Sequence, residues 1–315
     1  MQRIKEYHNV FYDGESVYKF TSLNEHKYLL NVFSRLETMM ADKFMDFDFY
    51  IYSTDTPKRR PESSNFHSSN KKILIMISDE SSYLPTDYAF EYTLVFKSYF
   101  NPTKTQNTEN IYPFPLGFVK NVPAVFPTLI SGRKHDVFFS GSLHKNRIAF
   151  YRELSGAGIF SLSMLKSVTG PSFMKKALLD VYGEDFSDEF YNSFIRFNRN
   201  EGFGLSAKYY GTMLGQTKIV LCPPGVHSSE THEIYEALRA GCVVISEKLP
   251  ATNLYKKSPI QQIDDWEEGL SLARSLLADP KKLAKLQEKS IKWYDRVFSE
   301  KAAAQFISFM ILNLK

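Results

Sequence analysis

The stretch that decides the fold is Lys218–Leu249, KIVLCPPGVHSSETHEIYEALRAGCVVISEKL. An apolar run of strand length comes first and stops at Pro223–Gly225, and a second apolar run begins after Gly241. Between them, apolar residues recur at helical spacing, which predicts a helix that starts near Ser229 or Glu230 and ends at Gly241. Strand, helix and strand make a βαβ unit, and open α/β sheets bind ligands at the carboxyl ends of such strands.

Short apolar runs and helical patterns alternate along the rest of the chain. The runs of strand length, bounded by turn-type residues, are predicted to be buried strands: Phe47–Tyr52, Ile73–Ile77, Tyr92–Phe96, Val137–Phe139, Lys218–Leu221, Val243–Ile245 and Ile260–Ile263. Helical spacing predicts helices at 24–44, 146–156, 173–182, 206–216, 230–240 and 266–278. The alternation predicts an α/β fold with two domains, 1–127 and 128–280, followed by helices over 281–315 with a break at Phe298–Ser299.

Composition is that of an ordinary globular protein. The 315 residues are 43% hydrophobic, and 15 glycines and 14 prolines exclude collagen-like and low-complexity classes. A formal net charge of +4 is too small to require a nucleic-acid partner. Two cysteines exclude a disulfide framework and favour a reducing, cytoplasmic compartment. The first residues lack the apolar stretch of a secretory signal, and no run reaches the roughly 18–20 apolar residues of a membrane span.

The polar residues of the quoted segment carry the most informative chemistry. Free N–H groups at the predicted helix start, over Ser228–Thr231, suit a diphosphate because the helix dipole is positive there. Glu233 and Glu236 are three residues apart and therefore share one flank of the helix. A carboxylate in this position can accept two hydrogen bonds from a ribose diol. The alternative is that Glu230, Glu233 and Glu236 are solvated acids on the helix surface.

The chain resembles the exostosin-like glycosyltransferases and their bacterial relatives of GT-B architecture. The residues that carry the resemblance are Pro224–Gly225, Thr231, Glu236–Ala237 and Gly241–Val243, together with Pro113–Gly117 and Asp136–Gly141 upstream. The resemblance implies two Rossmann-like, doubly wound domains that face a cleft, with C-terminal helices that cross back to the first domain. The first domain would receive an acceptor and the second would bind a nucleotide sugar.

In this family the glutamate of the Glu-Ala pair binds the ribose of the donor, so the resemblance assigns that role to Glu236. Many members have arginine where this chain has Glu233, so another cation is needed for the diphosphate, and Arg147 follows a predicted strand that ends near Gly141. The alternative for Arg147 is an ordinary surface arginine. The expected donor-binding residues are Gly141, Ser142, Arg147, Pro224, Gly225, Ser228, Ser229, Thr231, His232, Glu233 and Glu236.

The expected catalytic residues lie in the first domain. A buried strand leads directly into Asp79 and Glu80, either of which can serve as the base for an acceptor hydroxyl. The alternative for both is a turn or helix-cap acid. Lys97 is a second candidate at this edge, with a surface lysine as its alternative. The Asp46–Asp48 segment places two carboxylates on one side of a strand, but at the start of that strand, so no metal site is expected.

Together these features predict a metal-independent, inverting glycosyltransferase of the hexosyl or pentosyl class. It would move a sugar from a nucleotide sugar, with no other cofactor, to a glycan or lipid-linked glycan in polysaccharide biosynthesis. The lysine-rich helix at Lys281–Lys292 would allow peripheral association with the inner face of a membrane. The alternative for this helix is an ordinary solvated, charged face. Two alternatives stay open: a non-catalytic relative that binds carbohydrate or nucleotide, and a GT-B-shaped epimerase that acts on nucleotide sugars.

Overall fold

The computed structural model describes residues 1–15, 17–54, 59–101, 109–156, 172–199 and 204–314. The chain forms two compact units. The first contains Met1–Lys120, Pro250–Lys256 and Asp295–Lys315, and the second contains Asn121–Leu249 and Lys257–Tyr294. The chain thus first passes from one unit to the other after Lys120, whereas the expected domain limit is 127. The tail, expected as one block over 281–315, is divided between the two units.

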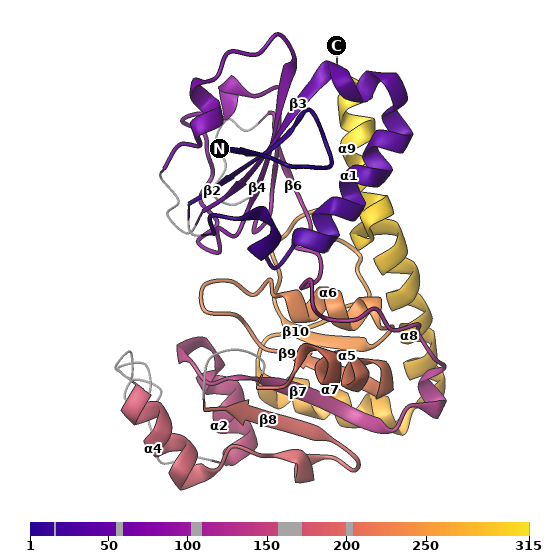
Figure 1. Cartoon of the computed structure of the whole chain (residues 1–315). Helices are drawn as coiled ribbons and strands as arrows, with labels where there is room; N and C mark the ends of the chain where they lie inside the picture. Colours follow the sequence, from indigo (N-terminus) through magenta and orange to yellow (C-terminus); the bar gives the residue numbers. More distant parts are fainter. Residues whose placement is uncertain (16, 55–58, 102–108, 157–171, 200–203, 315) are drawn as a thin grey trace. The chain divides into compact units, whose positions relative to one another are not determined.

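The first unit contains a six-stranded sheet (Figure 1). In spatial order its strands are β1 (Gln2–Arg3), β2 (Val10–Gly14), β3 (Phe47–Ser53), β4 (Lys71–Ile77), β5 (Leu94–Lys97) and β6 (Ile111–Pro113). β1 is antiparallel to β2, and the strands from β2 to β6 are parallel and follow chain order. The carboxyl ends of these parallel strands therefore lie at one edge of the sheet.

The two faces of this sheet are covered by different kinds of structure. Within the described residues of the unit, the helices are α1 (His26–Met40), α9 (Glu300–Leu312) and the 3-10 helices η1 (Phe20–Ser22), η2 (Ala41–Asp46), η3 (Glu62–Asn65) and η4 (Ala89–Glu91). Alternate strand residues point to opposite faces. Phe49 and Ile51 consequently share a core with α1 and α9, whereas Tyr50 belongs to a second core with Tyr88 of the segment that follows β4.

The second unit contains a five-stranded parallel sheet. In spatial order its strands are β11 (Gln261–Ile263), β10 (Val243–Glu247), β9 (Thr217–Cys222), β7 (His135–Ser142) and β8 (Phe194–Asn198). The chain goes from β7 to β8 on one side and then returns to β9 on the other side. This reversal puts a topological switch point between the carboxyl ends of β7 and β9, where open α/β sheets bind their ligands.

Helices cover both faces of the second sheet (Figure 1). They are α2 (Ile148–Ser155), α4 (Ser172–Tyr182), α5 (Ala207–Gln216), α6 (His232–Arg239), α7 (Trp266–Ala278) and α8 (Pro280–Trp293), with the 3-10 helices η6 (Ile130–Gly132), η7 (Lys145–Arg147) and η8 (Ser187–Glu189). One face packs its core residues against α2 and α7. On the other face, α5 and α6 contact β7, β9 and β10.

The predicted strands and helices agree with those of the structure in type and approximate position, and the prediction missed four strands. The missed strands are β1, β2, β6 and β8. β2 contains Asp13 and Gly14 and β8 contains an exposed Arg196, so neither reads as a continuous apolar run. The expected break in the tail is confirmed. A π-helical turn, η9 (Tyr294–Phe298), precedes α9, and Ser299 caps that helix by accepting a hydrogen bond from the Ala302 amide at 3.2 Å.

Gly117 lies where the packing of the first unit leaves no space for a side chain. Its φ is +76°, and a Cβ at this position would lie 2.4 Å from the ring of Tyr28. The ring is buried, and its hydroxyl donates to the Phe298 carbonyl oxygen at 3.0 Å, so it has little freedom to move. We expect Gly117→Ala to lower the free energy of unfolding by about 2–4 kcal/mol. Gly132→Ala, where a Cβ would meet open space, is the control in urea denaturation, and equal midpoints for the two variants would contradict this account.

Candidate functional site

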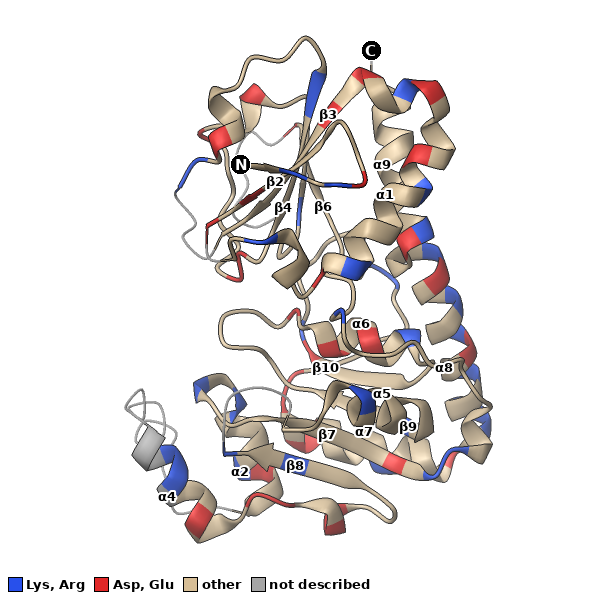
Figure 2. Cartoon of the chain, viewed as in Figure 1, with Lys and Arg blue, Asp and Glu red and all other residues tan. Residues whose placement is uncertain are grey.

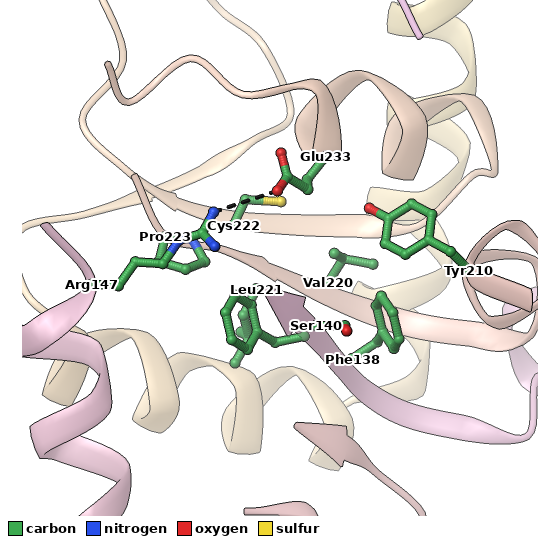
Figure 3. A pocket seen from close by; sticks show the side chains of 10 residues that line it. Phe138, Ser140, Arg147, Tyr210, Val220, Leu221, Cys222, Pro223 and Glu233 are labelled. Atoms are coloured by element: carbon green, nitrogen blue, oxygen red, sulfur yellow. Dashed lines mark hydrogen bonds and ion pairs between the residues drawn. The ribbon is translucent and has the colours of Figure 1, made fainter. Parts of the chain in front are cut away.

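A pocket lies at the switch point of the second unit (Figure 3). Its wall includes Ser140 from β7, Cys222 at the end of β9, Tyr210 from α5, Glu233 from α6 and Arg147, which immediately precedes α2. Arg147 and Glu233, predicted as donor-binding residues, are therefore brought together although 86 residues separate them in the chain.

The loop after β9 forms a turn of its own before α6 begins. The Gly225 amide donates to the Ser228 carbonyl oxygen at 2.7 Å, and the Glu230 amide donates to Ser228 Oγ at 3.0 Å. Serine side chains compete with helix hydrogen bonds in this way. The helix therefore starts at His232, and the prediction of a start near Ser229 or Glu230 is wrong.

This later start changes which groups belong to the helix N-terminus. The residue before the helix is Thr231, with φ −137° and ψ 153°, and it makes no side-chain cap hydrogen bond. Its Oγ1 is buried and has no hydrogen-bond partner among the residues that the structure describes. The amides of the helix begin at His232, so Ser228 and Ser229 lie outside the turn expected to hold a diphosphate.

Arg147 is a buried arginine, only 6% exposed, and not the surface residue of the alternative reading. Its Nε donates to the Pro224 carbonyl oxygen at 3.0 Å, and Nη1 donates to the Ser142 carbonyl oxygen at 3.3 Å. The guanidinium also lies 5.4 Å from the centre of the Phe139 ring. A Cβ at position 141 would be 2.3 Å from Nη1, so Gly141 is required for this packing.

The third nitrogen of the guanidinium pairs with a carboxylate. Nη2 of Arg147 lies 3.4 Å from Oε1 of Glu233, an ion pair drawn as a dashed line in Figure 3. The Glu233 side chain is 20% exposed and that of Arg147 is 7% exposed. Arg147 thus connects the end of β7, the Pro-Gly loop and the first turn of α6.

Asn146 is a site residue that the sequence analysis missed. Its Nδ2 donates to the carbonyl oxygens of Gly225 and Val226, both at 2.9 Å. Asn146 and Arg147 therefore hold three consecutive carbonyl groups of the Pro-Gly loop. The available signal was the Lys-Asn-Arg run shortly after a predicted strand, from which only Arg147 was expected in the site.

The acidic residues around α6 are not a solvated surface. Glu230 is 3% exposed and Glu236 is 2% exposed. Glu236 lies one helical turn after Glu233 and so shares its flank of α6. The alternative in which all three glutamates are surface acids is therefore wrong for Glu230 and Glu236, while the ribose role of Glu236 stays a prediction.

Burial determines the protonation of several groups around the pocket. Desolvation, with a smaller contribution from Arg147, lowers the pKa of His144 to about 4. Desolvation raises the pKa of Tyr210, and the nearby Glu236 carboxylate raises it further. Desolvation likewise raises the pKa of the Cys222 thiol. At neutral pH these three side chains are uncharged, and Arg147 is the buried cation of the pocket lining.

In the first unit, Asp79 is built into the turn after β4. Its Oδ1 accepts hydrogen bonds from the amide and hydroxyl of Ser81, and its Oδ2 accepts one from the Tyr83 amide at 2.9 Å. Lys97 Nζ lies 3.0 Å from Oδ2, and both side chains are at most 1% exposed. This geometry matches the turn-acid alternative for Asp79, and it contradicts the surface alternative for Lys97.

Glu80 differs from its neighbour. It is half-buried, and its backbone amide donates to the Ser78 carbonyl oxygen at 3.1 Å in a turn where Ser78 has φ +68°. Within the part of the chain that the structure describes, the Glu80 carboxylate has no hydrogen bond or ion pair, whereas the Asp79 carboxylate is held in the turn. Asp48, from the segment considered for a metal, accepts hydrogen bonds from Ser68 and Asn70.

The described ranges contain neither a candidate metal site nor a candidate membrane-spanning helix. No group of three or more His, Cys, Asp or Glu side chains is placed to hold a metal ion. None of the helices found there is long and apolar enough to cross a bilayer. Figure 2 shows both signs of charge along α8, where Lys292 pairs with Glu288 at 2.5 Å.

The buried pair of Asp79 and Lys97 leads to a stability prediction. Lys97→Met leaves a buried carboxylate without its cation, so we expect the free energy of unfolding to fall by roughly 3–5 kcal/mol. Lys292→Met removes a lysine from an exposed pair and should cost less than about 1 kcal/mol. Urea denaturation of both variants is the measurement, and a small loss for Lys97→Met would show that the pair is dispensable.

His144 leads to a prediction of pH dependence. Because its pKa falls from the ordinary 6.5 to about 4 on folding, the unfolded chain binds more protons between these values. Its contribution to stability is therefore lost as pH falls from about 6.5 towards 4. We expect the melting temperature of His144→Gln to fall less than that of the wild type between pH 7 and 4.5. The exposed His8→Gln is the control, and parallel wild-type and His144→Gln curves would refute this assignment.

Comparison with known proteins gives the fold. No protein-family model matches the chain, and no curated protein matches it in sequence. HepE from Anabaena in complex with UDP-glucose has a TM-score of 0.56 and 13% identity, over 98% of this chain and 100% of HepE. TarM has a TM-score of 0.50 and 13% identity, over 91% of this chain and 58% of TarM. This chain therefore has the α/β fold of the GT-B glycosyltransferases, with two Rossmann-like, parallel-sheet units.

Proposed function

We propose that the chain is a glycosyltransferase whose second unit binds a nucleotide-sugar donor at the switch point between β7 and β9. The observation that carries the proposal is the contact there between a buried arginine, Arg147, and the first turn of α6, which is followed one turn later by the buried Glu236. These three features supply a cation and amides for a diphosphate and an acceptor for a ribose diol. The solved HepE complex contains UDP-glucose, which makes UDP-sugars the first donors to test.

The contacts of the predicted residues support the following roles in the proposed site. Glu236 would accept the ribose hydroxyls, and the amides of His232 and Glu233, the Thr231 hydroxyl and Arg147 would surround the diphosphate. The other predicted residues act on the site through Arg147 and Asn146. Arg147 binds the carbonyl groups of Ser142 and Pro224, and Asn146 binds that of Gly225. Gly141 leaves the space that the Arg147 guanidinium occupies. Ser228 shapes the loop that leads into α6, and Ser229 lies in the same loop.

The proposed reaction is inverting and metal-independent. The acceptor hydroxyl oxygen attacks the anomeric carbon and forms the new glycosidic bond, while the bond from that carbon to the diphosphate breaks and the diphosphate leaves with the electron pair. Glu80 of the first unit takes the hydroxyl proton. The positive groups at the switch point stabilise the charge that develops on the diphosphate. We further propose that the enzyme is exostosin-like and that its acceptor is a glycan or a lipid-linked glycan. In this proposal α8 contacts an anionic membrane.

The burial of Asp79 favours one alternative function, that of a non-catalytic protein that binds carbohydrate or nucleotide. If Glu80 is also unable to act as a base, the protein binds the donor without transferring the sugar. Glu80→Gln distinguishes the two cases, because it abolishes turnover in the enzyme and changes nothing in a non-catalytic binding protein. An epimerase would instead convert the donor sugar with no acceptor added.

The donor site is tested by thermal shift of the purified protein with UDP, GDP, CMP, dTDP and their sugar conjugates, with and without EDTA. A ligand at about 100 times its Kd adds roughly 2.7 kcal/mol of stability, which makes a matching nucleotide visible. We expect Glu236→Gln to weaken nucleotide binding by roughly 10- to 100-fold, because a charge-assisted pair of hydrogen bonds to the ribose is lost.

The control is Glu267→Gln, an exposed glutamate of α7, which removes the same charge elsewhere in the unit. Wild-type affinity in Glu236→Gln would refute the ribose role. A shift that EDTA abolishes would refute metal independence.

A further inference from the structure

The contacts of Arg147 are of two kinds. Nε and Nη1 donate to the carbonyl oxygens of Pro224 and Ser142, which are neutral and belong to the backbone. Nη2 faces Glu233, a side-chain carboxylate. The two backbone contacts fix the position of the guanidinium, and the third is made to a group that can rotate away.

Several observations mark Glu233 as the replaceable partner. Its distance of 3.4 Å to Nη2 is longer than the approximately 2.7–2.9 Å of a strong charge-assisted hydrogen bond. Its side chain is 20% exposed, about three times the exposure of the Arg147 side chain. Glu233 also lies in the first turn of a helix, so its side chain can adopt another rotamer without any change in the backbone that holds Arg147.

The positive groups that stabilise the Glu233 carboxylate would also stabilise a phosphate. The carboxylate is stabilised by Nη2 of Arg147 and by the positive end of the α6 dipole. A phosphate at this helix N-terminus would be stabilised by those two groups and by the buried Thr231 hydroxyl, which lacks a partner among the described residues. Two anions cannot share one guanidinium nitrogen at low cost, because like charges repel in a pocket lined by Phe138 and Leu221.

We propose that Glu233 competes with the donor's phosphate for Nη2 of Arg147 and thereby sets the affinity of the site for nucleoside diphosphates. This inference rests on the proposed function. Donor binding then includes the release of Glu233 from Arg147, and the return of Glu233 favours departure of the nucleoside diphosphate after transfer. Glu233 is a specificity-determining residue in this scheme, and Arg147 remains the cation for either anion.

The test is calorimetric titration of the wild type and Glu233→Gln with UDP and with uridine, and with GDP, dTDP and their nucleosides in parallel. Glutamine keeps the length and one acceptor oxygen, so Arg147 retains a hydrogen-bond partner. We expect Glu233→Gln to bind the preferred nucleoside diphosphate about tenfold more tightly, which corresponds to about 1.4 kcal/mol. Binding of the nucleoside should not change, because it carries no phosphate.

Two further variants complete the experiment. Arg147→Lys should weaken diphosphate binding, and adding Glu233→Gln to it should recover much less than tenfold, because lysine cannot make all three contacts of the guanidinium. Glu267→Gln, on α7, should leave both affinities unchanged and so excludes a general effect of net charge.

Each adverse result has a separate meaning. Equal or weaker diphosphate binding by Glu233→Gln, while Glu236→Gln still weakens it, overturns the competition and leaves the donor site in place. An equal gain for nucleoside and diphosphate also overturns it, because the effect is then not directed at phosphate. Wild-type protein that binds none of the nucleotides overturns the proposed function and this inference together.

Discussion

The buried guanidinium of Arg147 is the interaction on which the geometry of the second unit's site depends. It joins three pieces of chain that are distant in sequence: the end of β7, the Pro-Gly loop and the first turn of α6. A cation with five donors in one plane can do this, whereas a lysine ammonium has no comparable geometry. The position of the guanidinium also explains why residue 141 is a glycine, because any side chain there would occupy the space of Nη1.

The two sheets use buried charge at their carboxyl edges in different ways. In the first unit, Lys97 and Asp79 are both buried, and Asp79 is saturated by hydrogen bonds within its own turn. That arrangement stabilises one conformation of the turn and leaves Asp79 little capacity for chemistry. In the second unit, Arg147 keeps one nitrogen for a partly exposed carboxylate, so part of its binding capacity faces a group that can be exchanged.

Much of the fold could be predicted from the sequence because the signals are local. The apolar runs at β3, β4, β7, β9 and β10 are buried on both faces, as parallel strands are, and they stand out without any knowledge of their neighbours. The strands that escaped prediction lie at sheet edges or carry polar residues. The start of α6 was predicted too early because the hydroxyl of Ser228 forms a local turn that competes with the helix.

The site was predictable in its residue types but not in its pairings. Arg147 and Glu233 were both expected near a donor, yet as independent groups, and the Asn146 contacts to the Pro-Gly loop were not expected at all. The turn that holds Asp79 is local, formed with Ser81 and Tyr83, but its buried ion pair depends on Lys97, which comes from the neighbouring strand β5. Hydrogen-bond partners of this kind lie on different elements, and no local pattern reports them.

The sequence by itself determined the alternation of strands and helices, the βαβ segment with its Pro-Gly loop, and the chemical groups available at the strand ends. These depend on backbone propensity and on the periodicity of apolar residues, which act over a few positions. Only the tertiary structure decided the strand order that creates the switch point, the burial of Glu236, and the contact of Arg147 with Glu233. The reason is that burial and ion pairing depend on which segments pack together, and the contact that defines this site joins residues 86 positions apart.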